Sequence, residues 1–195
     1  MAEEATVVGV ATGEAEEKKK MKVLVAVDES EGSFYALRWA LDHLCGADEV
    51  VGAEPTTDNS HVVLLLLHVE QPFQHYMFPA GPGVYATSAA VESIRKGQEE
   101  NSRCILSRAM KICLEKKVTA ETLVMGGDPK DMICQAGEQL GTDLVVVGSR
   151  GLSTIKRAFL GSTSDYVAHH APCPVLIVKP PKHTQEQAAR HMLDG

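Results

Sequence analysis

The sequence predicts an α/β protein with an open, doubly wound sheet of five parallel strands and helices on both faces. Three observations lead to this fold class. Short apolar runs rich in valine and leucine alternate with amphipathic stretches, as in successive β-α-β units. Aromatic residues make up only 5% of the chain, so the core is expected to be aliphatic. The length of 195 residues favours one domain over two small ones.

The five apolar runs are the predicted strands, and they lie at 21–28, 61–69, 118–125, 143–147 and 175–179. The second run, HVVLLLLHV, is apolar almost throughout, which is typical of a strand buried on both faces. The third run is less apolar, so we place it near a sheet edge.

Four helices are predicted between these strands. Phe34, Leu37 and Leu41 recur at helical spacing in the first, which Ser30 or Ser33 caps and Gly46 ends. The second is a long polar stretch with an apolar stripe at 88–117.

The two remaining helices carry clear boundary signals. Asp128 and Pro129 predict the start of the third, as an N-cap followed by a proline at the first helical position. The fourth runs from 162 to 170 and stops before Ala171-Pro172.

The remaining segments are tails that flank a single expected domain at 21–180 and loops that lie within it. Residues 1–20 and 181–195 are predicted to be flexible tails, because they are polar and poor in large apolar groups. The stretches 46–60 and 71–87 contain glycine and proline and are predicted to be long loops.

Composition excludes several classes of protein. A net charge of -7 argues against a general nucleic-acid binder, which needs clustered basic residues. The longest strongly apolar run, 62–67, is too short to cross a membrane. The acidic N-terminal stretch does not resemble a signal peptide, and the five cysteines are scattered without disulfide or metal spacing. We expect a cytoplasmic protein with reduced thiols and no membrane partner.

The candidate site begins where the fourth strand ends, in the stretch DLVVVGSRGLSTIKRAFLGSTS at 143–164. The strand meets glycines at Gly148 and Gly151, and Gly161-Ser162 follows at a helix start. Glycines let a backbone approach a ligand closely, and free N–H groups at a helix start attract anions. Ligands of open α/β sheets bind where the strand order reverses. In the order 3-2-1-4-5 the reversal falls between the first strand, ending at Asp28, and the fourth.

Other phosphate-binding and catalytic motifs are missing from the sequence. It has no GxxxxGK[ST] loop, no kinase HRD or DFG motif and no GxSxG elbow. The stretch Gly81 to Ala86 mimics GxGxxA, but its proline and its loop context make it a decoy. The sequence therefore fits a protein that binds phosphate better than a hydrolase or a kinase.

Several segments together resemble the universal stress protein family, in its ATP-binding branch. The spacing from Gly148 through Gly151 to Gly161-Ser162 is similar to the signature G-2x-G-9x-G-[S/T] of that family. VLVAVDES at 23–30, LLLHV at 65–69 and PCPVLIVK at 172–179 also match. The resemblance covers about 20–180, and the insertions resemble those of plant members. It implies a Rossmann-like fold of the adenine nucleotide alpha hydrolase type.

The resemblance also implies the ligand and its contacts. ATP, AMP or ADP would lie across the ends of the first and fourth strands, with Mg²⁺ or Mn²⁺ accompanying the phosphates. The implied binding residues near the base and ribose are Ala26, Val27, Asp28 and Val69. Those implied near the ribose and phosphates are Val147, Gly148, Arg150, Gly151, Gly161, Ser162, Thr163 and Ser164. No catalytic residue is assigned, and the metal ligands stay unknown.

Each of these assignments has a structural alternative. Asp28 is also a possible cap of the first helix, and Gly148 with Gly151 a possible left-handed turn. Ser162 and Ser164 would then be helix caps that bind no ligand. Gly127 and Asp128, at the third strand-to-helix turn, are further pocket candidates.

The function that the resemblance implies is a nucleotide-responsive regulatory module of the stress response. Two alternatives stay open: a slow ATPase or autophosphorylating enzyme using Ser162, Thr163 or Ser164, and an ATP-independent stress chaperone. In this family the last strand, here Val175–Lys179, pairs with its mate, so a homodimer is also implied.

Overall fold

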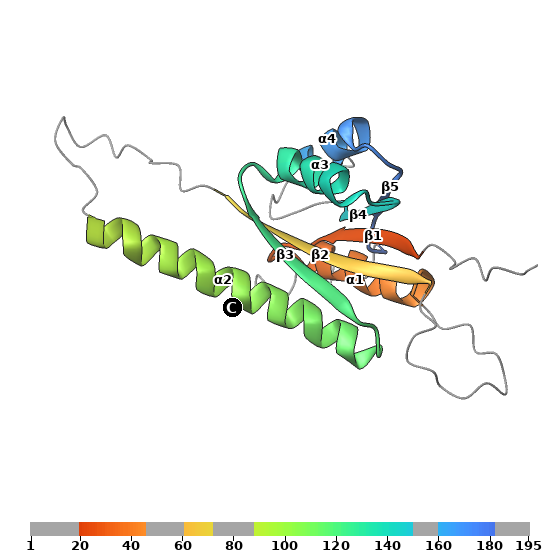
Figure 1. The fold of residues 1–195 in the computed structure, drawn as a ribbon, viewed down its shortest axis with the longest axis horizontal. Helices are drawn as coiled ribbons and strands as arrows, with labels where there is room; N and C mark the ends of the chain where they lie inside the picture. The colour runs from red at the N-terminus through yellow and green to blue at the C-terminus, as the bar shows by residue number, and fades with distance from the viewer. Residues whose placement is uncertain (1–19, 46–60, 72–87, 150–159, 182–195) are drawn as a thin grey trace, which may run out of the picture.

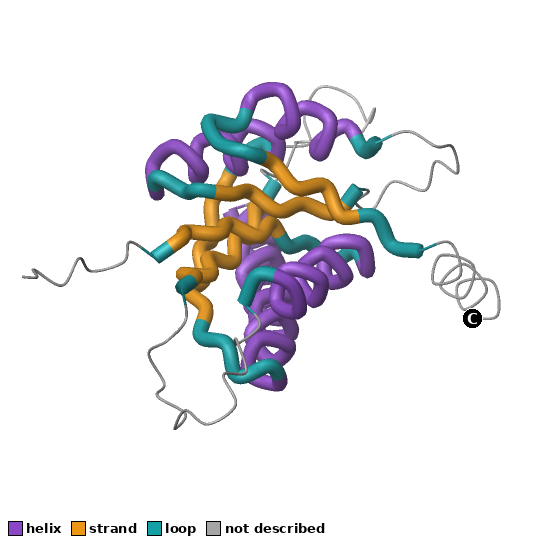
Figure 2. The backbone as a smooth tube through the Cα atoms, turned by 90° about the vertical axis from the view of Figure 1, so that its right-hand side faces the viewer, coloured by secondary structure: helices purple, strands orange, loops and turns teal. Residues whose placement is uncertain are grey.

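The five predicted strands form one parallel sheet with the order β3-β2-β1-β4-β5, which confirms the predicted topology. The computed structural model describes residues 20–45, 61–71, 88–149 and 160–181. The predicted tails and loops lie almost wholly outside these residues. The strands are β1 (Met21–Ala26), β2 (Val62–Glu70), β3 (Ala120–Gly126), β4 (Leu144–Gly148) and β5 (Val175–Val178). Figures 1 and 2 show the twisted sheet between two layers of helices.

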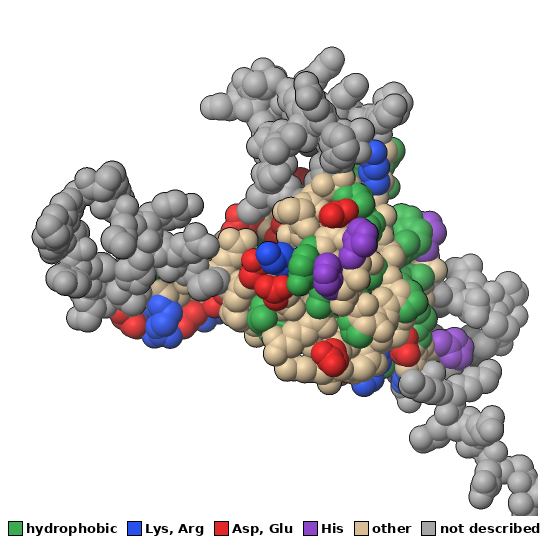
Figure 3. All heavy atoms as spheres, turned by 90° about the horizontal axis from the view of Figure 1, so that it is seen from above, with side chains coloured by type: hydrophobic (Ala, Val, Ile, Leu, Met, Phe, Trp, Pro, Cys, Tyr) green, Lys and Arg blue, Asp and Glu red, His purple; other side chains and the backbone are tan. Residues whose placement is uncertain are grey.

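The helices divide evenly between the two faces of the sheet. They are α1 (Glu31–His43), α2 (Ser88–Glu115), α3 (Pro129–Leu140) and α4 (Ser162–His170). Helices α1 and α2 cover one face, and α3 and α4 cover the other (Figure 1). Figure 3 looks onto the α3 and α4 face, where acidic, basic and histidine side chains are interspersed.

Alternation along the strands builds one apolar core on each face. In β1, Val23 and Val25 belong to the core under α1 and α2, whereas Leu24 belongs to the core under α3 and α4. All three side chains are fully buried. The period of two in a strand therefore explains why a continuously apolar run is needed here: both faces are covered.

The helix starts follow local capping chemistry. Ser30 is the N-cap of α1, and its side chain accepts a hydrogen bond from the Ser33 amide at 3.3 Å. This decides between the two predicted caps in favour of Ser30. Asp128 caps α3 as predicted, with Pro129 at its first helical position. Gly141 ends α3 with a φ of 57°, in the left-handed region that favours glycine.

Several predicted boundaries are shifted, and those at the end of β1 and between α2 and β3 have a clear structural cause. The first strand ends at Ala26 rather than Asp28, because the chain turns there toward α1. The third begins at Ala120 rather than Val118, and α2 ends at Glu115. Lys117 adopts a φ of 57°, and the Val118 amide bonds back to the Cys113 carbonyl at 3.0 Å. This helix-terminating turn takes up the first residues of the apolar run.

Two further properties follow from the described residues. None of the helices among them combines the length and apolarity needed to cross a bilayer. All five cysteines are free thiols.

Candidate functional site

A cavity of about 810 Å³ lies at the carboxyl ends of β1, β2 and β4, where the strand order reverses. It is lined by the ends of these strands, by α2, and by the first turns of α3 and α4. Every predicted site residue that the structure describes lines this cavity: Ala26, Val27, Asp28, Val69, Val147, Gly148, Gly161, Ser162, Thr163 and Ser164. Arg150 and Gly151 lie outside the described residues.

The ends of β1 and β2 form an apolar part of the cavity lining, and a buried histidine bonds to the backbone there. The Val27 amide donates to the Leu67 carbonyl at 2.8 Å, which extends the β1–β2 ladder by one step. The Val27 carbonyl lies 2.9 Å from Nδ1 of His68, whose side chain is buried. His68 lines the cavity but was not predicted to be a site residue. Its sequence signal was a lone polar residue inside an otherwise apolar strand.

Asp28 organises the turn between β1 and α1. Its Oδ1 accepts hydrogen bonds from both the amide and the hydroxyl of Ser30. Ser33 also bonds to the backbone of Asp28. Its hydroxyl lies 3.0 Å from the Asp28 carbonyl, and its Oγ accepts a hydrogen bond from the Asp28 amide. The alternative that Asp28 caps α1 is therefore wrong, because the N-cap is Ser30. Asp28 fixes the loop that closes one side of the cavity.

Gly148 is required by helix packing. A Cβ built at this position would lie 2.9 Å from both the carbonyl carbon and the carbonyl oxygen of Gly32, at the start of α1. The alternative of a left-handed turn is wrong for Gly148, because the described glycines with positive φ are Gly127 and Gly141. The bare backbone thus lets β4 and α1 meet at the cavity wall.

The start of α4 presents a helix N-terminus without a side-chain cap. Gly161 is the N-cap, with φ −65°, and this glycine supplies no side-chain hydrogen bond to the first turn. The alternative that Ser162 and Ser164 act as caps is therefore wrong. The first amides of a helix have no partner within the helix, and their partial positive charge attracts anions. The exposed Ser162 and the half-buried Thr163 line the cavity at this end.

Ser149 ties this helix to the sheet and was also missed. Its amide donates to the Val178 carbonyl at 2.8 Å, and its carbonyl accepts from the Gly161 amide at 2.9 Å. The Ser164 hydroxyl, which is buried, lies 2.9 Å from the Gly161 carbonyl and 3.3 Å from that of Ser149. These bonds join the residue that follows β4 to the start of α4.

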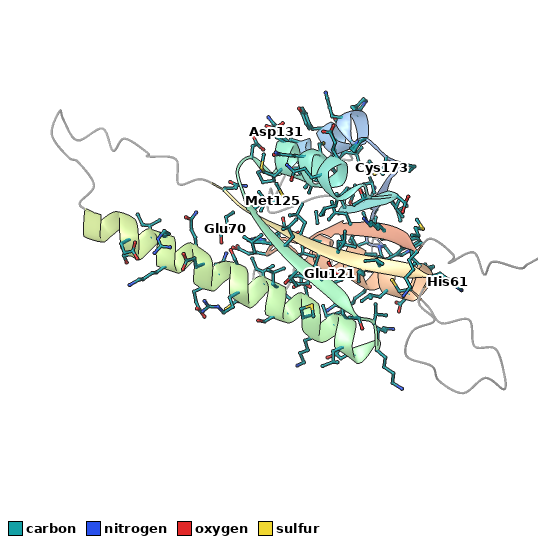
Figure 4. All side chains as sticks on the ribbon, in the orientation of Figure 1. His61, Glu70, Glu121, Met125, Asp131 and Cys173 are labelled. Atoms are coloured by element: carbon teal, nitrogen blue, oxygen red, sulfur yellow. The ribbon has the colours of Figure 1, made fainter. Side chains whose placement is uncertain are left out.

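Helix α2 supplies a polar wall that sequence reasoning did not find. The Ser102 hydroxyl donates to Oε1 of Glu70 at 2.6 Å, and the Asn101 amide donates to Glu29. Gln98 donates to the carbonyl of Gln71 at 2.8 Å. Glu70 lies between the end of β2 and α2 in Figure 4. These contacts join residues that are far apart in the chain, so no local sequence pattern predicts them.

The charge of the described lining is negative. Asp28, Glu29 and Glu70 contribute carboxylates, and the described lining residues include no lysine or arginine. No group of three or more histidine, cysteine or acidic side chains with metal-binding geometry occurs in the described part of the chain. Gly127 and Asp128 do not line the cavity, although Pro129 and Ile133 beyond them do.

Comparisons with known proteins agree on one family. The model of the universal stress protein family matches residues 20–179. Universal stress protein YxiE of Bacillus subtilis is 35% identical over 158 residues, which cover 81% of this chain and 98% of that protein. A universal stress protein A-like protein of Arabidopsis thaliana is 30% identical over 167 residues, covering 81% and 89%.

Solved structures show the same fold. A universal stress protein family protein from Arabidopsis thaliana, crystallised with AMP bound, superposes with a TM-score of 0.55 at 26% identity and covers 84% of this chain and 94% of that one. Universal stress protein UspA from Lactobacillus plantarum superposes with a TM-score of 0.57 at 22% identity, covering 82% and 98%. The doubly wound architecture is therefore confirmed.

Proposed function

This chain belongs to the universal stress protein family, and we propose that it binds an adenine nucleotide and acts as a nucleotide-responsive regulatory module in the stress response. The nucleotide is ATP, with AMP and ADP as related ligands of the same site. The protein would act in the cytoplasm.

The observation that carries this proposal is the cavity at the reversal of strand order. In open α/β sheets this is the position at which ligands bind. Its volume of about 810 Å³ falls in the range of small-molecule sites. The related Arabidopsis protein with AMP bound supports an adenine nucleotide as the ligand.

The cavity residues fit the parts of a nucleotide. Ala26, Val27 and Val69 offer apolar surface and backbone groups for the base, and Asp28 offers a carboxylate for ribose hydroxyls. Ser162 and Thr163, with the uncapped start of α4, offer hydroxyls and amides for phosphate. Arg150 and Gly151 remain part of the proposal, as neighbours of this phosphate end in the sequence.

A divalent cation would enter with the nucleotide. Mg²⁺ prefers oxygen ligands and is commonly held by substrate phosphates with one or two protein groups. The described residues offer single carboxylates, such as Asp28, rather than a preformed cluster. We therefore propose that Mg²⁺ or Mn²⁺ binds mainly through the phosphates of ATP.

Autophosphorylation is a second candidate, because Ser162 and Thr163, which carry hydroxyl groups, are among the residues that line the cavity. Labelled ATP separates the two candidates. Stoichiometric retention of the nucleotide without turnover supports a binding module. Turnover or labelling that disappears in Ser162→Ala supports an enzyme.

The proposed assembly is a homodimer through Val175–Lys179. Strand β5 is the last strand of the sheet, and among the described strands it pairs only with β4. Its outer edge therefore carries backbone groups that a second copy can bond.

Titration calorimetry with ATP and AMP tests the proposal. Gly161 has a φ that any residue adopts, so Gly161→Val places a branched side chain in the cavity lining without backbone strain. We expect it to abolish binding. Gly126→Val is the matched control, because Gly126 lies outside the cavity and a Cβ there meets nothing within 4 Å.

Analysis of the purified protein gives a second readout of the same proposal. We expect protein prepared without added ligand to release ATP or AMP on denaturation. Finding no released nucleotide, together with no heat of binding in the titration, contradicts the proposal.

A further inference from the structure

The two ends of the cavity differ in chemistry. At one end, β4 and the start of α4 contribute Gly148, Ser162 and Thr163, together with an uncapped helix N-terminus. At the other end, the chain beyond β1 and the end of β2 meet α2. Strand β1 lies between β2 and β4, so two strand spacings, roughly 10 Å, separate these ends. A ligand that fills the cavity therefore meets two different environments.

The α2 end is acidic. We call Glu29 and Glu70, with their α2 partners Asn101 and Ser102, the acidic wall. Each carboxylate accepts a hydrogen bond from a neutral donor: Glu70 from the Ser102 hydroxyl at 2.6 Å, and Glu29 from the Asn101 amide. Ser102 is only 4% exposed and Glu70 is half-buried, so the bond between them is partly shielded from water. Neutral donors position these carboxylates without cancelling their charge.

The arginines of α2 are paired with other carboxylates. Arg108 bonds to Glu31 on α1 at 2.6 Å, and Arg103 bonds to Glu100 at 2.8 Å. Arg95 pairs with Glu92 at 2.7 Å and also with Glu99. None of these arginines is among the described residues that line the cavity. The acidic wall thus faces the ligand space with its charge retained.

A carboxylate wall accepts hydrogen bonds and repels anions. It suits parts of a nucleotide that carry N–H or O–H donors, such as the purine amino group and the ribose hydroxyls. In dinucleotide-binding folds an acidic residue near the second strand bonds a free ribose hydroxyl, whereas a nearby arginine accommodates a ribose phosphate. Glu70 is the last residue of β2. A second phosphate on the ribose would face like charge here.

From this arrangement we propose that the acidic wall makes the site select adenine nucleotides phosphorylated at the 5′ position alone. Nucleotides with a further phosphate on the 2′ or 3′ hydroxyl are rejected by charge. This selectivity rests on the proposed nucleotide function and adds the class of ligand that the site excludes. The 5′ phosphate lies at the α4 end, and the donor-bearing parts lie toward α2.

Titration calorimetry of the full chain with two probes tests this selectivity. The probes are 5′-AMP and adenosine 3′,5′-bisphosphate, which differ only in the ribose phosphate. We expect the wild-type protein to bind AMP about tenfold more tightly or better, since the like charges of the wall and of the ribose phosphate repel each other in the cavity. Raising the salt concentration should narrow this preference, because salt screens the charges.

Two isosteric substitutions assign the effect to the wall. Glu29→Gln with Glu70→Gln removes both charges and keeps an oxygen that Asn101 and Ser102 can bond. We expect the AMP preference of this double variant to fall to about threefold or less, as the repulsion is lost. Glu121→Gln is the matched control, because Glu121 is exposed on β3 and lies outside the cavity (Figure 4). It should keep the wild-type preference.

The outcomes separate this inference from the function on which it rests. Equal affinity of the wild-type protein for the two probes contradicts the inference, and so does a preference unchanged in the folded double variant. Circular dichroism establishes the folding of each variant. Absence of AMP binding to the wild-type protein instead contradicts the proposed function, and the inference falls with it.

Discussion

At the scale of single residues, Gly148 carries two roles that sequence alone does not separate. Its motif position suggests close approach to a ligand, whereas the structure gives a steric reason in the backbone of α1. The two roles are compatible, because Gly148 lines the cavity and also packs against the backbone of Gly32. A glycine in a binding motif can therefore be required by the fold before any ligand binds.

Replacing Gly148 with alanine should destabilise the protein without ligand. The added Cβ would lie 2.9 Å from backbone atoms of Gly32, which cannot move aside as a flexible side chain does. We expect the free energy of unfolding to fall by about 1–3 kcal/mol, the usual cost of overpacking. Urea denaturation measures this loss. Gly126→Ala is the control at another strand end, where a Cβ meets nothing within 4 Å; equal stability of the two variants would refute the steric role.

Cys113 links stability to pH. Burial raises the pKa of the Cys113 thiol to about 11, from an ordinary value of 9.0. Because the folded-state pKa lies above the unfolded one, the neutral thiol stabilises the fold below pH 9, and this contribution is lost as the pH rises toward 11. We expect the stability of the wild type to decline more steeply over this window than that of Cys113→Ala. Parallel slopes in urea denaturation would contradict the expectation.

At the scale of elements, the connection between β4 and α4 shows how a helix start is held in place. Ser149 bonds to β5 through its amide and to Gly161 through its carbonyl. The Ser164 hydroxyl adds bonds inside the same turn. The helix N-terminus is thereby fixed against the sheet edge while its first turn carries no side-chain cap.

Ser164→Ala and Ser162→Ala should separate positioning from binding. The buried Ser164 hydroxyl donates its one proton among two neighbouring carbonyls, those of Gly161 at 2.9 Å and Ser149 at 3.3 Å, so its loss should cost about 1 kcal/mol of stability and weaken nucleotide binding. Ser162 is exposed in the cavity lining, so its loss should weaken binding and leave stability unchanged. Urea denaturation and calorimetry measure the two effects. A large stability loss in Ser162→Ala would overturn this division.

The sequence predicts elements well where local chemistry decides them. The cap at Asp128, the proline after it and the stop before Pro172 fall as predicted, because each depends on neighbouring residues. The start of β3 does not, since the preceding turn places Lys117 at a φ of 57°, a conformation for which a lysine gives no signal in the sequence.

The candidate site divides in the same way. The predicted glycine and serine residues of the β4–α4 stretch that the structure describes, Gly148, Gly161, Ser162 and Ser164, line the cavity. Asn101 and Ser102 on α2 carry no motif, and they reach the site because α2 packs beside β2. Contacts between residues so far apart in the chain follow from the tertiary fold, which a single sequence does not specify residue by residue.

At the scale of the whole molecule, the sheet has two edges, β3 and β5. The carbonyls of Pro174 and Val178 accept from the amide of Val145 in β4 and from that of Ser149 directly after it, at 3.0 and 2.8 Å. Since backbone groups alternate along a strand, the N–H of Leu176 points toward β4 and that of Ile177 points outward. The proposed homodimer would form through the backbone groups of β5 that point away from β4.

Ile177→Pro should separate dimerisation from folding. Proline removes an outward N–H at an edge position, where it is tolerated, and leaves the β4–β5 ladder intact. We expect a folded monomer by light scattering coupled to size-exclusion chromatography. Ile177→Ala controls for the lost side chain and should stay dimeric, whereas Leu176→Pro should unfold the edge because it breaks a ladder bond. A dimeric Ile177→Pro would place the interface elsewhere.

The central claim is that the cavity at the reversal of strand order holds an adenine nucleotide, and an NMR titration tests it residue by residue. With ¹⁵N-labelled protein and AMP, the amide signals of Val27, Val69, Ser162 and Thr163 should shift together and saturate. The signal of Glu121, on β3 and outside the cavity, should stay in place. Saturable shifts that map to another surface would contradict the claim. So would the absence of shifts at millimolar AMP, since this would mean a dissociation constant above the millimolar range.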